Sequence, residues 1–219
     1  MIRVINITKR FDCITVLDNV SFEVSDQLVA IFGPTGTGKS VLLKIIVGLL
    51  KPDSGNIIID QGETIGFVFQ HSALFDSLTV EENIGLPLRE CSCLSEKEIS
   101  KRIQRVIEML NLDQRFLDRK VTGLSGGERK IVAIARAIIT NPKYLFYDEP
   151  TTGLDPMMHD KICSTIKSLS KPGILVTHSF DTIKKIGTQN AFLLKVGKLS
   201  QMDNDTNQTN DTKRNLTTN

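Results

Sequence analysis

The feature that most constrains this chain is a glycine-rich segment between an apolar run and a helix. The run 29–32 is continuously apolar, as expected of a parallel strand buried on both faces. In the G-x-x-x-x-G-K-[ST] segment that follows, backbone N–H groups and the helix start attract phosphate, the lysine reaches the β and γ phosphates, and the serine ligates Mg²⁺. A merely structural turn would need neither the lysine nor the hydroxyl. The sequence therefore predicts a site for ATP and Mg²⁺, built from Gly33, Pro34, Thr35, Gly36, Thr37, Gly38, Lys39, Ser40 and Val41.

A second apolar run, 144–147, ends in two adjacent carboxylates, Asp148 and Glu149. An acidic pair after a strand is by itself more often a solvated loop. Beside a phosphate-binding loop it has the arrangement of a Walker B segment. We expect Asp148 to hold Mg²⁺ through its hydration shell, and Glu149 to orient the attacking water or accept its proton.

The segment 124–128 reads Leu-Ser-Gly-Gly-Glu and lies upstream of the acidic pair. It resembles the signature motif of ABC ATPases. Ser125, Gly126 and Gly127 would present a hydroxyl and uncrowded N–H groups to an anion at a helix start. Taken alone, the pattern Ser125 to Glu128 is also that of an ordinary capping box.

Four further residues match the ABC pattern in order, so the resemblance covers about residues 2–199. It implies that Gln70 senses Mg²⁺ and the γ phosphate, and that His178 contacts the γ phosphate. Asp155 would communicate across a dimer, and it is also a plausible helix N-cap. Phe11 would stack on adenine, with an ordinary core phenylalanine as the alternative. The resemblance thus implies four catalytic residues, Lys39, Gln70, Glu149 and His178, and three metal-binding residues, Ser40, Gln70 and Asp148.

The expected fold is α/β. The resemblance implies a P-loop NTPase of the ABC nucleotide-binding type, with a RecA-like parallel core, an antiparallel β lobe and an inserted helical lobe at about 71–140. Alternating apolar residues in the first third predict the β lobe, and helical patterns from Leu94 and from Ser125 predict helices. We expect this domain to span 1–200. The polar composition of 201–219 predicts a disordered tail.

One P-loop and one signature segment predict that the chain pairs with a second copy of itself. In ABC ATPases the signature segment of one subunit covers the nucleotide held by the other, so ATP joins the two copies. His71 and His159 match no motif, and we expect both on the surface.

Charge and composition limit the remaining partners. Lys plus Arg number 27 against 25 for Asp plus Glu, a net charge of +2 that gives no argument for nucleic acid. No signal-like apolar stretch opens the chain, and the apolar run 41–50 is too short to cross a bilayer. We therefore expect a cytoplasmic or plastid stromal location, peripheral on the inner membrane through a permease.

The segments 36–44 and 69–90 are similar to the ATPases of Mla-type phospholipid transporters and their plastid lipid-import counterparts. The resemblance implies phospholipid import through a separate permease, with a lipid-binding protein as a further partner. An amino-acid importer ATPase and a soluble Fe–S-assembly ATPase are the alternatives. We expect the permease helix to dock beside Gln70 and the segment 73–90, with Leu74, Phe75 and Leu78 as anchors.

Overall fold

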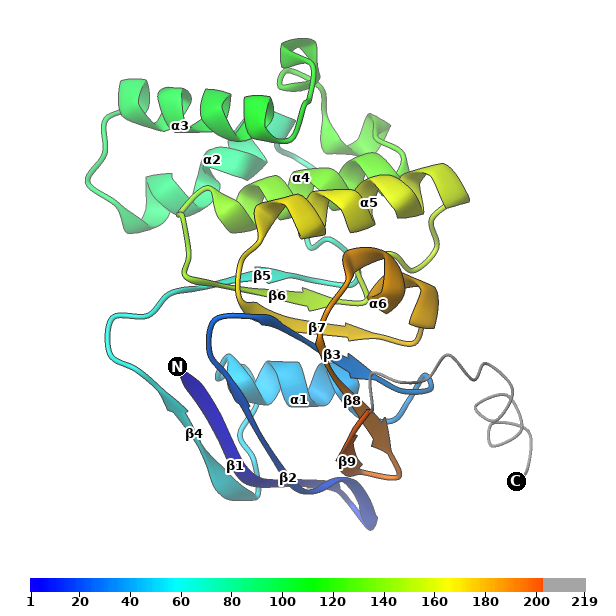
Figure 1. Cartoon of the computed structure of the whole chain (residues 1–219). Coiled ribbons are helices and arrows are strands. Elements are labelled where there is room, and N and C mark those ends of the chain that lie inside the picture. Colours follow the sequence, from blue (N-terminus) through cyan, green and yellow to red (C-terminus); the bar gives the residue numbers. More distant parts are fainter. Residues whose placement is uncertain (203–219) are drawn as a thin grey trace.

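The central layer is a six-stranded sheet, seen edge-on in the middle of Figure 1. The computed structural model describes residues 1–202. Neighbouring strands are parallel except for the last pair. The order is β5 (Ile65–Val68), β6 (Tyr144–Asp148), β7 (Gly173–Thr177), β3 (Leu28–Phe32), β8 (Asn190–Lys195) and β9 (Lys198–Gln201).

Both faces of this sheet are covered, and its central strands β6 and β7 are buried at every position. In β6, Leu145 and Tyr147 pack with the helices on one face, whereas Tyr144 and Phe146 pack on the opposite face. The helical face holds α4 (Gly126–Ile138) and α5 (Pro156–Leu169). The short helix α6 (Phe180–Ile186) supplies Ile183 to a smaller cluster against β3 and β8.

The second face carries α1 (Lys39–Ile46) and a three-stranded antiparallel sheet, drawn below the central sheet in Figure 1. The order of this sheet is β2 (Ile14–Val24), β1 (Ile2–Phe11) and β4 (Ser54–Ile59). Val4 and Ile7 are both buried although strict alternation would place them on opposite faces. Asn6 between them has φ 54°, and the strand register shifts there, so a β-bulge turns both apolar side chains toward the buried face.

The helical lobe gathers above the sheet in Figure 1 and packs on α4. It contains α2 (Val80–Cys91), α3 (Glu96–Met109) and the short 3-10 turns Gln114–Phe116 and Val121–Gly123. These elements lie within the stretch 71–140 expected to form this lobe. Sequence reasoning did not identify α2, which contains Pro87.

The architecture confirms the expected α/β fold with its parallel core and antiparallel β lobe. Strand β9 continues through Gln201, and the Met202 N–H donates to the Ala191 carbonyl at 2.8 Å. The folded part therefore extends slightly past the boundary expected at residue 200. The rest of the predicted tail lies outside the described residues.

Candidate functional site

The glycine-rich loop leaves the carboxyl end of β3 and enters α1, as the sequence predicted. Gly36 and Gly38 have φ values of 83° and 96°, which lie in the left-handed region. A Cβ on Gly38 would also stand 2.7 Å from Cγ1 of Val16. Glycine is therefore required where the loop turns into the helix, and the turn leaves the first N–H groups of α1 facing a possible anion.

The lysine of this loop is held by its own loop and by an acidic residue from β6. Lys39 is 5% exposed, and its Nζ donates to the carbonyls of Gly33 at 2.8 Å and Pro34 at 3.0 Å. The same Nζ lies 3.3 Å from Oε1 of Glu149. A phosphate entering the loop would compete with these partners for the ammonium group.

Ser40 and Asp148 come together from α1 and the end of β6. Ser40 Oγ donates to Asp148 Oδ1 at 2.6 Å. Burial raises the pKa of the Asp148 carboxyl, while the Ser40 hydrogen bond and the charges of Lys44 and Lys130 oppose that rise. A hydroxyl and a carboxylate are oxygen ligands of the kind Mg²⁺ prefers, so these residues fit that ion. Within residues 1–202 no cluster of three or more His, Cys, Asp and Glu could hold a metal, so a cation would draw further ligands from phosphate and water.

Glu149 is the most densely contacted carboxylate of the site, and its side chain is 8% exposed. Its Oε2 lies 2.8 Å from His178 Nδ1 and accepts from the His178 N–H at 3.3 Å and from Thr152 Oγ1 at 3.1 Å. Its backbone has φ 47, an unfavourable value of the kind that gathers at active sites. These contacts fix the direction of the carboxylate.

A cavity of about 500 Å³ opens over these residues, within the size range of small-molecule sites. Its wall combines residues of the P-loop, residues that follow the strands β5, β6 and β7, and residues of the β lobe. The lining residues are Phe11, Val16, Thr35, Gly36, Gly38, Lys39, Ser40, Val41, Gln70, Glu149, Thr152 and His178. Phe11 is 44% exposed, and Lys9 Nζ stands 5.4 Å from its ring centroid. This exposure excludes the alternative that Phe11 is an ordinary core residue.

The predicted signature residues and Asp155 do not line that cavity in the described part of the chain. They begin helices instead. Ser125 caps α4 by accepting from the Glu128 N–H at 3.2 Å, and Asp155 caps α5 by accepting from Met157 N at 3.0 Å. Gly126 has open space where a Cβ would be. The cavity of the single chain is therefore lined by P-loop residues together with Gln70, Glu149 and His178, whereas the signature residues and Asp155 lie outside it.

Comparison with known proteins identifies the family. The ABC transporter family model matches residues 17–152, from β2 through the loop, the signature segment and the acidic pair. This chain belongs to the ABC transporter family. It is an ABC ATPase cassette, and the order of its motifs along the fold is the order that sequence analysis expected.

The probable sulfate/thiosulfate import ATP-binding protein CysA of Chlorella vulgaris is 38% identical over 213 residues, covering 90% of this cassette and 88% of CysA. TRIGALACTOSYLDIACYLGLYCEROL 3, a chloroplastic protein of Arabidopsis thaliana, is 38% identical over 218 residues, covering 84% of the cassette and 63% of that protein. Others at 34 to 39% identity are named for import of molybdate or tungstate, Fe(3+) ions or methionine. The cassette spans 53 to 63% of the length of several of these relatives.

A solved structure described as a dimeric, post-hydrolysis state of the ATP-binding cassette MJ0796 with ADP and Pi superimposes with a TM-score of 0.83. It is 33% identical, and the match covers 93% of this cassette and 99% of that chain. No helix among residues 1–202 is long and apolar enough to cross a membrane.

Several contacts of the site were not predicted from sequence. Lys130, on α4, is 5% exposed and donates to the backbone oxygens of Gln70 and Glu149. His159 was expected on the surface, but its side chain is only 16% exposed and its Nε2 lies 3.0 Å from Thr182 Oγ1. A lysine among apolar residues of an amphipathic helix was the available signal for Lys130. His71 is exposed, as expected.

Ser179, which follows His178, caps α6 by accepting from the Thr182 N–H at 3.3 Å. This cap fixes the start of the helix that follows His178.

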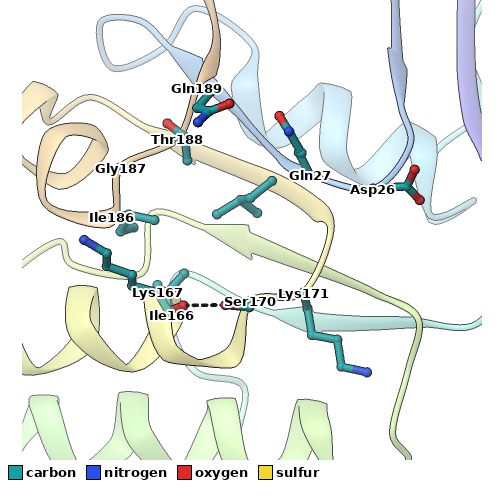
Figure 2. Close-up of a pocket in the computed structure, with 11 residues that line it drawn as sticks. Asp26, Gln27, Ile166, Lys167, Ser170, Lys171, Ile186, Gly187, Thr188 and Gln189 are labelled. Carbon is teal, nitrogen blue, oxygen red and sulfur yellow. Dashed lines mark hydrogen bonds between the residues drawn. The ribbon is translucent and has the colours of Figure 1, made fainter.

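A separate hollow of about 290 Å³ lies where β3, β7 and β8 begin, opposite the nucleotide loop (Figure 2). Figure 2 shows it between the ends of α5 and α6 and the segment before β3, with Lys167, Lys171 and Asp26 at its wall. It shares no residue with the nucleotide cavity.

Proposed function

We propose that this cassette binds ATP with Mg²⁺, closes on it as a dimer, and hydrolyses it to power an import-type transporter whose cargo is phospholipid. The observation that carries the nucleotide role is the cavity in which Lys39, Ser40 and Glu149 converge beside the P-loop. The glycines, N–H groups and buried lysine of that cavity suit a triphosphate.

Within the site each group has a distinct task. The P-loop N–H groups and Lys39 hold the β and γ phosphates, and Phe11 provides an aromatic face for adenine. Ser40, Asp148 and Gln70 would hold Mg²⁺, which neutralises phosphate charge when bound. Glu149, aimed by His178 and Thr152, accepts the proton of the attacking water. His178 then faces the γ phosphate from the end of β7.

The signature residues complete the site from a second copy. Ser125, Gly126 and Gly127 begin α4 outside the cavity of their own chain. Ser125 is engaged in the capping box with Glu128 through its N–H and its hydroxyl oxygen, so the N–H groups of Gly126 and Gly127 and the hydroxyl hydrogen of Ser125 would meet the γ phosphate of a partner. The dimeric state described for MJ0796 supports this arrangement. Asp155, exposed at the start of α5, would contact the partner beside it.

Two adjoining hollows of about 490 and 290 Å³ form a groove beside Gln70 that suits a helix of a permease. Both are lined by Ile65, Phe67 and Phe69, and the two phenylalanine rings lie 4.3 Å apart. We propose this groove as the docking site. It replaces the anchors expected from sequence, because Leu74, Phe75 and Leu78 do not line either hollow.

Phospholipid as cargo rests on the resemblance of segments 36–44 and 69–90 and on the chloroplastic relative from Arabidopsis. The methionine import relatives favour an amino-acid importer as the second candidate. Both readings place the cassette on the inner face of a membrane through its permease, in the cytoplasm or the plastid stroma. A lipid-binding protein would be a further partner only under the first.

Purification of the native complex tests the cargo. Recovery of a lipid-type permease with a lipid-binding protein supports the proposal, whereas recovery of an amino-acid permease or of Fe–S assembly proteins contradicts it. The docking groove is tested separately by changing Phe67 and Phe69 together to alanine, which should abolish stimulation of ATP hydrolysis by the permease. Met109→Ala is the matched control, since Met109 is an exposed apolar residue (64%) that lines neither hollow.

A further inference from the structure

A buried lysine of α4 ties together two segments that the nucleotide site depends on. Lys130 Nζ donates to the backbone oxygen of Gln70 and lies 3.4 Å from the backbone oxygen of Glu149. Gln70 follows β5, and Glu149 follows β6. One ammonium group on α4 therefore connects the segments that follow two adjacent strands of the central sheet.

The Lys130 side chain is buried and lies near two carboxylates, Asp148 and Glu149. Burial lowers the pKa of the lysine, and the charges of Asp148 and Glu149 raise it. A charged group buried in this way costs free energy unless its hydrogen bonds are made, and charge-assisted bonds are the stronger ones. The Glu149 backbone oxygen that it meets belongs to a residue with φ 47, so the bond supports an otherwise unfavourable conformation.

Arg136, also on α4, contacts the segment that follows Gln70. Its guanidinium donates to the carbonyls of Ser72 at 2.9 Å and Ala73 at 2.8 Å. Ser72 and Ala73 have φ values of 60° and 48°, so two consecutive residues with side chains are in the left-handed region. Both Ala73 and Arg136 also line the groove beside Gln70.

We propose that Lys130 is a positioning residue for ATP hydrolysis, which sets the backbone of Gln70 and Glu149 from the signature helix. Lys130 does not line the nucleotide cavity, so it acts through these two residues. Arg136 extends the same hold to the groove, so that a partner docked there moves α4 and the Gln70 loop together. The proposal rests on the ATP site described above and holds whichever cargo the transporter carries.

The test compares Lys130→Met, which removes both hydrogen bonds at similar length, with Lys130→Arg, which keeps charged donors. Arg129→Met is the matched control on the same helix, because Arg129 reaches the same loop through an exposed pair with Asp76 at 3.3 Å. Steady-state hydrolysis gives kcat and KM. A fluorescent ATP analogue gives nucleotide affinity in EDTA and again with Mg²⁺, and thermal melting reports the folded fraction.

We expect Lys130→Met to lower kcat about 10- to 100-fold, the usual effect of losing a hydrogen bond to a charged group. Affinity in EDTA should stay within about threefold, because the P-loop contacts are intact, while the gain in affinity on adding Mg²⁺ should shrink. Lys130→Arg should recover most of kcat, and Arg129→Met should match the wild type. If Lys130→Met does not fold, Lys130→Gln, which keeps an N–H donor without charge, takes its place.

The result that overturns the proposal is a kcat within threefold of wild type, or a fall in kcat matched by an equal loss of affinity in EDTA with no recovery in Lys130→Arg. A double-mutant cycle with Gln70→Ala distinguishes failure of the positioning role of Lys130 from failure of the proposed ATPase function. If Lys130 acts through Gln70, the combined loss in kcat is clearly smaller than the product of the single losses. Full additivity contradicts the action of Lys130 through Gln70 even if ATP hydrolysis itself is confirmed.

Discussion

Replacing Glu149 by glutamine should slow hydrolysis and at the same time tighten ATP binding. The carboxylate lies 3.3 Å from Lys39 Nζ, and both side chains are under 10% exposed. Two unit charges at that distance attract by about 5 kcal/mol at an effective dielectric constant near 20, before the desolvation of both groups is counted. A net effect of about 1.5–3 kcal/mol is typical of a hydrogen bond to a charged group.

Glutamine keeps the shape of Glu149 and its contacts with His178 and Thr152, but it no longer holds the charge of Lys39. The lysine is then free for phosphate, so Kd for ATP should fall about tenfold or more. Loss of the general base should lower kcat about 10²- to 10⁴-fold. Single-turnover hydrolysis and equilibrium titration with an ATP analogue measure the two effects.

Glu96→Gln is the matched control. Glu96, on α3, forms an ion pair with Arg89 of α2 (Oε2 to Nη2, 3.1 Å), and its side chain is 69% exposed. It should leave both quantities unchanged. An unchanged or weaker affinity of Glu149→Gln would refute the competition between Glu149 and phosphate for Lys39. A kcat within about tenfold of wild type would refute the role of Glu149 as the base.

Three further outcomes follow from single contacts. Lys39→Met should weaken ATP binding about 10- to 150-fold in a direct titration, because the phosphates lose their buried cation; unchanged affinity would exclude that role. Because burial raises the pKa of Asp148 in the folded chain, its ionised form destabilises the nucleotide-free fold as pH rises through the folded-state pKa. Asp148→Asn should therefore raise Tm near neutral pH, with a smaller gain in acid, and abolish Mg²⁺-dependent hydrolysis; a lower Tm near neutral pH would contradict this. Gly173→Ala should lower stability by about 2–4 kcal/mol in a denaturant titration, because its Cβ would stand 1.8 Å from the Leu145 oxygen; a wild-type midpoint would be inconsistent with that close contact.

The local parts of the site could be predicted from sequence because their signals are local. The P-loop, the capping box at Ser125 and the N-cap at Asp155 each depend on residues within a few positions of one another. The helix α2 had such a signal too, since Thr79 and Glu82 form a capping box. Pro87 within the segment masks the helical pattern.

Contacts between distant segments could not be predicted in this way. Lys130 reaches Gln70 across 60 positions of sequence and Arg136 reaches Ser72 across 64, so nothing near either basic residue indicates its partner. His159 was misjudged for the same reason, because Thr182 comes from another helix. The bulge at Asn6 is local, but an asparagine alone does not indicate a left-handed backbone.

The central claim is that two copies of this cassette share each ATP site, and mixing two inactive variants tests it most directly. Lys39→Ala disables the P-loop and leaves the signature segment intact. Gly126→Asp does the reverse, since open space around Gly126 tolerates a side chain in the monomer while the new charge repels the partner's phosphates.

Each variant alone should be inactive. An equimolar mixture should regain up to about a quarter of wild-type ATP hydrolysis, because half of the dimers are mixed and each mixed dimer has one intact site. A mixture no more active than its separate components, at concentrations where the wild type hydrolyses ATP, would contradict a site shared between two chains.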